Sequence, residues 1–136
     1  MLTLDILGVE EDGRNRSPLV PNNVRTSLRW TLQTDVLVRL KALYPDGSPR
    51  DLTGCTLTIA AKKTPGVGAT LFTVVADPST ISKNTVEFTL TGKSQASWAS
   101  GWYVWGVWCT NPGVGGARVQ LVPASPLLLD PVLLAL

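Results

Sequence analysis

Few residues of this 136-residue chain combine the types and the spacing that catalysis or metal binding requires. The chain has no histidine, which excludes the usual zinc sites and all histidine-based triads. Carboxylates remain, and since hard cations prefer oxygen ligands, Glu10–Asp12 or the pair Asp46 and Asp51 are the candidates for a loop metal. Aspartates in such segments more often serve only to form a turn. We therefore expect no metal and no cofactor.

An acid and base pair such as Asp51 with Glu87 is the remaining catalytic possibility. Nothing in the sequence brings these two carboxylates together on one substrate. Cys55 and Cys109 are the only cysteines, and in a reducing compartment such residues are typically small buried hydrophobes. We therefore expect that the protein is not an enzyme.

Tryptophan is the residue type best suited to binding here, because exposed indole rings stack on sugars and bases. Among the five tryptophans, Trp102 and Trp108 fall on one side of one alternating stretch. They would stand about 20 Å apart at strand rise, too far for adjacent rings of one short ligand. We favour packing of both against a neighbouring element or subunit; binding of a surface glycan is the alternative.

The charge and hydropathy patterns limit the kinds of partner that we expect. Twelve basic and ten acidic residues give a net charge of +2, and the basic residues are scattered, whereas a nucleic-acid footprint would be denser. No apolar run approaches the roughly 18 residues of a membrane span, and the start lacks the pattern of a signal peptide. We expect no nucleic acid, no membrane and synthesis in the cytoplasm. A chain that is 44% apolar and only 16% charged suits a protein in contact with partners.

The stretches that carry these candidates alternate apolar and polar residues, the pattern of half-buried β-strands. Examples are Asp35–Tyr44, Cys55–Lys62 and Thr85–Thr91, whereas Trp102–Thr110 is apolar on both faces and is expected to be covered on both. About seven short strands predict an all-β sandwich. The residues expected to face the core are Val38, Leu40, Leu57, Ile59, Phe88, Leu90, Tyr103 and Trp105.

The composition divides the chain into an arm at 1–24, a sandwich at 25–123 and an apolar tail at 124–136. Pro123 and Pro126 would limit pairing of the last strand to an edge. The tail either docks on a partner or completes the same sandwich as a final strand. The residues expected at a partner interface are Leu127, Leu128, Leu129, Val132, Leu133, Leu134 and Leu136, together with Trp102 and Trp108.

Three short motifs punctuate the strands. Asp46-Gly47 is suited to a turn that needs a positive φ, and in Asp51-Leu52-Thr53-Gly54 the glycine lets the chain enter a strand where a side chain would collide. Gly101-Trp102-Tyr103-Val104-Trp105 then follows a segment, 93–98, suited to a single helical turn. In this order and spacing, over roughly Leu28 to Val122, the motifs resemble the immunoglobulin-like domains of tailed-phage virions, typified by the N-terminal domain of the baseplate upper protein.

The resemblance implies an immunoglobulin-like antiparallel β-sandwich and a place in the virion. It implies a non-enzymatic structural component of the tail, baseplate or fibre attachment region that assembles with other virion proteins and with copies of itself. A capsid decoration or head-fibre protein is a second structural interpretation. A carbohydrate-binding adhesion module is an interpretation from a different class.

Overall fold

The computed structural model describes residues 1–9, 27–64, 67–110 and 118–132. In these ranges the chain forms eight strands and two short 3₁₀ helices. The strands are β1 (Leu2–Val9), β2 (Leu28–Thr31), β3 (Val36–Leu43), β4 (Thr56–Thr64), β5 (Val67–Val75), β6 (Thr85–Leu90), β7 (Gly101–Thr110) and β8 (Arg118–Asp130). The 3₁₀ helices are η1 (Pro78–Thr80) and η2 (Lys93–Gln95), and η2 occupies the segment predicted as a helical turn.

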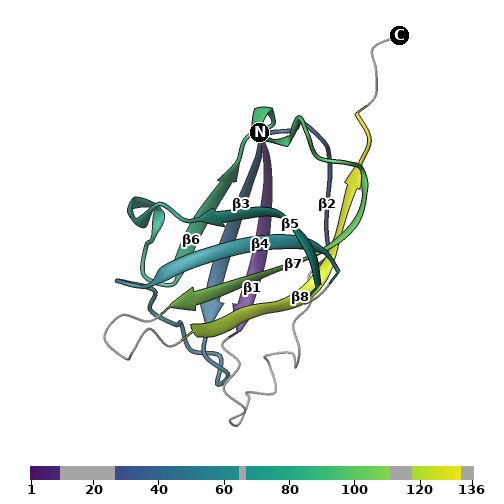
Figure 1. Cartoon of the computed structure of the whole chain (residues 1–136). Helices are drawn as coiled ribbons and strands as arrows, with labels where there is room; N and C mark the ends of the chain where they lie inside the picture. Colours follow the sequence, from purple (N-terminus) through teal and green to yellow (C-terminus); the bar gives the residue numbers. More distant parts are fainter. Residues whose placement is uncertain (10–26, 65–66, 111–117, 133–136) are drawn as a thin grey trace.

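The strands make a three-stranded sheet in the order β1-β3-β6 and a five-stranded sheet in the order β2-β8-β7-β4-β5. β4, β7 and β8 run across β1, β3 and β6, which lie behind them in Figure 1, and β2 lies beside the curled end of β8. The prediction of an all-β sandwich is confirmed. The expected antiparallel pairing is wrong for β1 with β3 and β2 with β8, which are parallel, because alternation fixes the buried face of a strand and not its direction.

Residues Leu2–Val9, expected to belong to an arm, are instead a strand of the sandwich. Ile6 and Val9 are buried against the core, so the alternation at the start of the chain outweighs the polar residues that follow. A Cβ at Gly8 would stand 2.9 Å from Leu40 Cδ1 and 3.1 Å from Leu121 Cβ, so this glycine lets β1 pack tightly against both neighbours. Positions 10–24 of the expected arm lie outside the described residues.

The first half of the expected tail is the second half of β8. Leu127 and Leu129 are fully buried in the chain's own core, which corrects their assignment to a partner interface. β2 pairs with β8 only from Leu127 onward, so Pro123 and Pro126 sit where β8 has β7 as its single partner. Val132 is 39% exposed, and the other predicted interface residues of the tail, Leu133, Leu134 and Leu136, lie outside the described residues.

The core lies between the two sheets, and the structure buries every residue expected there: Val38, Leu40, Leu57, Ile59, Phe88, Leu90, Tyr103 and Trp105. Tyr103 Oη donates a hydrogen bond to the Ala99 carbonyl at 2.7 Å. This is the bond of the tyrosine corner of immunoglobulin-like folds, and β8, β7, β4 and β5 follow the order of strands G, F, C and C′ in that fold. Trp105 Nε1 donates to the Pro126 carbonyl at 3.1 Å, which ties β7 to β8.

A buried amide fixes the end of the sandwich where the strand β7 begins. Gln95 is fully buried, and its Oε1 accepts from Trp30 Nε1 at 3.1 Å and from the Gln33 backbone N–H at 2.9 Å. Its Nε2 donates to the Thr34 carbonyl at 2.8 Å and to the Thr91 carbonyl at 3.2 Å. Because the whole amide is hydrogen-bonded, it connects η2 to the β2–β3 turn without leaving a buried polar group unsatisfied.

Candidate interaction surface

The outer face of the five-stranded sheet is the candidate site, because apolar side chains point away from the core there. Strand β7 buries every second residue, which leaves Trp102, Val104, Gly106 and Trp108 on the outer side. On β8, Pro126 lies opposite Val104 and Leu128 opposite Trp102. Trp102 is 61% exposed, and Leu128 is half-buried beside it. These accessible apolar side chains make this face the candidate for contact with another molecule.

A hollow of about 390 Å³ lies on the same face. Ala60 and Gly106 are paired across β4 and β7 and line this hollow, which their small size leaves open. A Cβ at Gly106 would meet the Val122 carbonyl oxygen at 3.0 Å, so a larger residue is disfavoured at this position. Lys62 and Arg118 add positive charge at the rim, so the hollow suits an apolar or acidic group of a partner.

The two predicted interface tryptophans share this outer face but differ in environment. Trp108 is half-buried, and the Arg118 guanidinium lies over its ring at 4.0 Å. This cation–π contact occupies one face of the indole within the chain itself. Trp102 is 61% exposed, so at this end of β7 the chain itself does not supply the cover that the sequence predicts for the outer face. Among the predicted interface residues that the structure describes, Trp102, Trp108, Leu128 and Val132 keep accessible surface, and Trp102 keeps the most.

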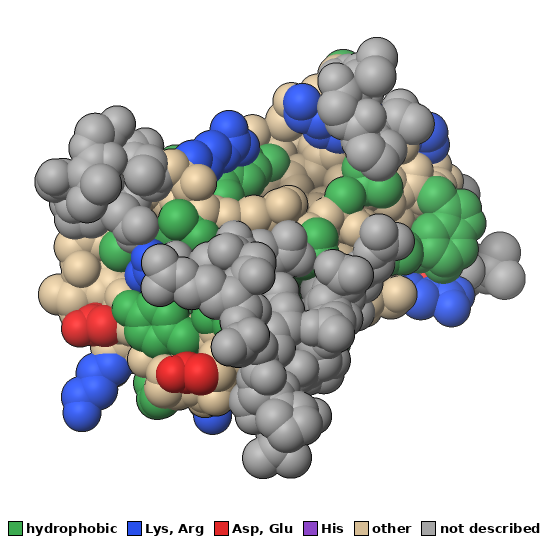
Figure 2. Space-filling model, turned by 90° about the horizontal axis from the view of Figure 1, so that it is seen from below, with side chains coloured by type: hydrophobic (Ala, Val, Ile, Leu, Met, Phe, Trp, Pro, Cys, Tyr) green, Lys and Arg blue, Asp and Glu red, His purple; other side chains and the backbone are tan. Residues whose placement is uncertain are grey.

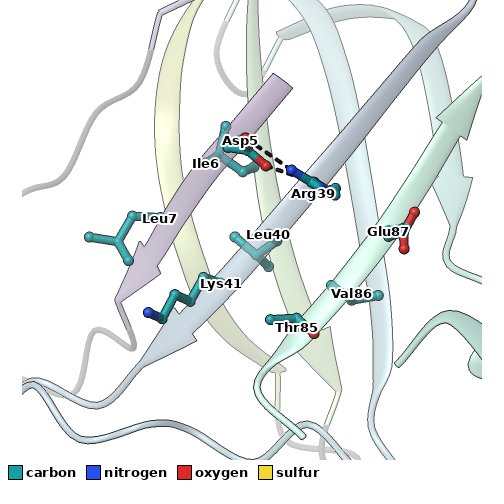
Figure 3. A pocket seen from close by; sticks show the side chains of 9 residues that line it. All are labelled: Asp5, Ile6, Leu7, Arg39, Leu40, Lys41, Thr85, Val86 and Glu87. Carbon is teal, nitrogen blue, oxygen red and sulfur yellow. Dashed lines mark hydrogen bonds and ion pairs between the residues drawn. The ribbon is translucent and has the colours of Figure 1, made fainter. Parts of the chain in front are cut away.

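The outer face of the three-stranded sheet has the opposite character. Arg39 donates from Nε to Asp5 Oδ1 at 2.8 Å across β1 and β3, and Glu87 lies opposite Arg39 on β6 (Figure 3). The bond from Arg39 holds the pKa of the Asp5 carboxyl below its ordinary value. A hollow of about 590 Å³ lies over this row, and its lining combines these charged residues and Lys41 with apolar ones such as Leu7. Exposed charged pairs of this kind remain well solvated.

The predicted motif residues form turns at the ends of strands. Gly47, Gly54 and Gly101 have φ values of 90°, 79° and 135°, which side chains rarely adopt. Gly54 is therefore required by its backbone conformation. In the same motif Leu52 is completely buried, and its N–H donates to the Lys83 carbonyl, so this residue anchors the turn to the core.

The aspartates considered for a loop metal act inside these turns. Asp46 Oδ1 accepts from the N–H and hydroxyl of Ser48, and Asp51 Oδ1 accepts in the same way from Thr53. These bonds lower the pKa of both carboxyls. In the described part of the chain, no three or more Cys, Asp or Glu side chains gather in a group that suits a metal ion. The described part also contains no helix long and apolar enough to cross a membrane.

Viewed from below, hydrophobic side chains form separate patches with Lys and Arg around them (Figure 2).

Sequence reasoning identified Trp102 and Trp108 but missed Lys62, Ala60, Gly106 and Arg118, which share their face. The alternation of β4 and β7 contains the signal for Ala60 and Gly106. It did not reveal that these small residues pair across the strands and line one hollow.

Comparison with known proteins finds similarity only among solved structures. No family model matches the sequence, and no curated protein matches it either. A solved structure described as the N-terminal domain of phage TP901-1 ORF48 matches with a TM-score of 0.46 and 12% sequence identity, over 96% of this chain and 99% of that one. At this TM-score the similarity carries no argument about function.

Proposed function

We propose that the protein is a non-enzymatic structural subunit of a tailed-phage virion, in the tail, baseplate or fibre attachment region. The observation that carries the proposal is the apolar outer face of β7 and β8 around Trp102, which is 61% exposed. A free monomer gains nothing from this surface, whereas a subunit that docks on a neighbour buries it. The order of the turn motifs, which resembles that of virion immunoglobulin-like domains, supports the same role.

The mechanism is geometric. The sandwich is a rigid spacer, since its two sheets share one core that includes Trp105, Phe88 and Leu40. A partner buries the apolar face and places its own acidic or apolar groups against Lys62 and Arg118. In this proposal the partners are other virion proteins and copies of the same chain, and the final location is the particle.

The test is the protein content of purified particles. Mass spectrometry of particles from cells that produce this protein should detect the chain at a fixed number of copies per particle. Gold-labelled antibody in electron microscopy would then separate a place on the tail from a decoration of the head. A chain found only in the soluble lysate and never in washed particles would overturn the proposal.

Exposure of Trp102 also supports a second candidate, a carbohydrate-binding module that attaches the particle to its host. This candidate requires the indole to stack on a sugar ring. Titration with host polysaccharide should then shift the fluorescence of the wild-type protein and leave that of Trp102→Ala unchanged. If polysaccharide leaves the wild-type fluorescence unchanged as well, the second candidate fails.

A further inference from the structure

The four edge strands of the sandwich differ in how well they are protected. Edge strands expose unpaired backbone groups that can recruit a strand from another chain, and charged residues, proline, short length or covering groups normally block this. At the edges of the five-stranded sheet stand β2 and β5, and at the edges of the three-stranded sheet stand β1 and β6.

Three of these edges are blocked. On β6, the Thr80 hydroxyl donates to the Asp77 carbonyl at 2.7 Å, lies 3.2 Å from the Glu87 carbonyl and accepts from the Glu87 N–H at 3.4 Å, so Thr80 covers this part of the edge. Strand β2 is four residues long and carries the ion pair of Arg29 with Asp130 at 2.7 Å. Strand β1 carries the charge of Asp5, paired with Arg39.

A β-bulge also protects an edge, and register shifts interrupt the pairing of β5 with β4 between Ala61 and Thr64. The second half of β5, Phe72–Val75, pairs in regular register and has none of these devices. Val67–Val75 has the sequence VGATLFTVV, without a charged residue or proline over nine positions. Among the edge strands it is the only one with no charge. Within the described residues β5 pairs with β4 alone. By the rules of edge protection, this strand is a template for strand addition.

The register identifies the backbone groups that point outward. The Ala76 N–H donates to the Leu57 carbonyl at 2.9 Å, so these two residues form a hydrogen-bonded pair. Such pairs alternate along an antiparallel ladder, so Val74 and Phe72 also bond to β4. Thr73 and Val75 therefore direct their N–H and C=O groups away from the sheet. Both side chains are exposed, Val75 at 59%.

The space beside this edge is apolar as well. An open groove of about 400 Å³ lies between β5 and the end of β6, and its lining includes Phe72, Leu90 and Trp98. Trp98 stacks on Phe72 with ring centroids 5.1 Å apart and is only half-buried. A strand added to β5 would cover the open side of this groove.

We propose that β5 pairs antiparallel with β5 of a second copy, about a two-fold axis at Val74, so that Thr73 lies opposite Val75 of the other copy. In this register Thr73 and Val75 each donate and accept one backbone hydrogen bond across the interface. The occupant is a second copy because β5 offers no charge to a charged segment, whereas an uncharged strand of β-branched residues matches itself without repulsion. The inference rests on the proposed role in assembly and names one of its contacts.

The experiment places charges on this edge. Thr73→Lys with Val75→Lys sets four lysines against one another across the axis, and both side chains point to solvent in the single chain. Thr73→Glu with Val75→Lys sets each glutamate opposite a lysine of the other copy. Thr3→Lys with Thr89→Lys, two exposed positions on the three-stranded sheet, is the matched control.

Sedimentation equilibrium of the full chain should show a dimer for the wild type, the control and the Glu/Lys variant. The Lys/Lys variant should dissociate at least about tenfold more readily, while its unfolding midpoint stays unchanged. Hydrogen exchange should show slow Thr73 and Val75 amides in the wild-type dimer only. A wild-type monomer, or a dimer that survives the Lys/Lys change, overturns the pairing; neither result affects detection of the chain in particles, which tests the proposed function separately.

Discussion

The outer faces of the two sheets arise from the same alternation of residues along the strands, yet they carry different kinds of side chain. On the three-stranded sheet, Asp5, Arg39 and Glu87 form a row of alternating charge across the strands. On the five-stranded sheet, the corresponding outward positions of β7 hold Trp102, Val104 and Trp108. The first face is suited to water and the second to a partner. The inward residues of both sheets build one core, whereas the outward residues distinguish the sheet that we propose meets another molecule.

The largest effect that tests this comparison comes from two tryptophans on opposite sides of β7. Trp105→Ala should lower the free energy of unfolding by about 3–5 kcal/mol because it leaves a cavity in the core. Trp102→Ala should change it by only about 0.5 kcal/mol, since the exposed ring packs on little. Urea denaturation monitored by circular dichroism measures both. Equal losses would mean that the outer face belongs to the fold and not to an interface.

The next effect concerns binding. Trp102→Ser should weaken incorporation of the protein into particles at least about tenfold, because a buried aromatic anchor commonly contributes about 2 kcal/mol or more to an interface. Leu37→Ser, a half-buried position on the outer face of the three-stranded sheet, is the matched control and should leave incorporation unchanged. Quantitative mass spectrometry of particles assembled with each variant measures this. A larger loss of incorporation for Leu37→Ser than for Trp102→Ser would indicate that the three-stranded sheet, and not the five-stranded one, contacts the partner.

A smaller effect is the salt dependence of stability, which should differ between substitutions on the two faces. The pair of Asp5 and Arg39 is exposed to solvent, so added salt should screen it, and Arg39→Gln should lower the thermal midpoint slightly in dilute buffer and not at about 1 M salt. Val104→Thr on the other face removes no charge, and its effect on the midpoint should be the same at both salt concentrations. A salt-independent effect of Arg39→Gln would show that packing of its side chain, and not its charge, matters on this face.

The smallest effect is a pH dependence. The hydrogen bond from Arg39 lowers the pKa of Asp5 in the folded protein, so the folded state binds this proton less readily than the unfolded state. The resulting stability is present above the ordinary aspartate pKa and is lost as the pH falls through the lowered one. Asp5→Asn should therefore make the unfolding midpoint less sensitive to acid, measured by thermal melts from neutral to strongly acidic pH. An unchanged slope would contradict the pairing.

Much of the sandwich could be predicted because successive residues of a half-buried strand alternate between the core and the outer face. Val38, Leu40, Ile59 and Phe88 were assigned to the core on this pattern alone, and all are buried. The tail was harder because the run Leu127–Leu129 is apolar without interruption. Its alternation appears only once β2 and β7 flank the strand, which buries Leu127 and Leu129 and leaves Leu128 partly accessible.

The candidate surface and the edge were less accessible to sequence reasoning. Trp102 and Trp108 could be placed on one face because both are even-numbered positions of one strand. The contact of Arg118 with Trp108 lies between two strands, and no local sequence pattern predicts it. Gln95 reads as an ordinary polar residue of a surface turn. Its burial follows from its contact with Trp30 and Gln33, which lie 65 and 62 residues away in the sequence.

By itself the sequence determined the all-β class, the strand faces and the turns, because φ preferences, alternation and Asp side-chain bonds act within a few residues. The tertiary structure alone decided which strands became edges, the parallel placement of β1 and β2, and the exposure of Trp102 and of the β5 backbone. These depend on the order of strands in the sheets, and that order is set by how the whole core packs and not by any one segment.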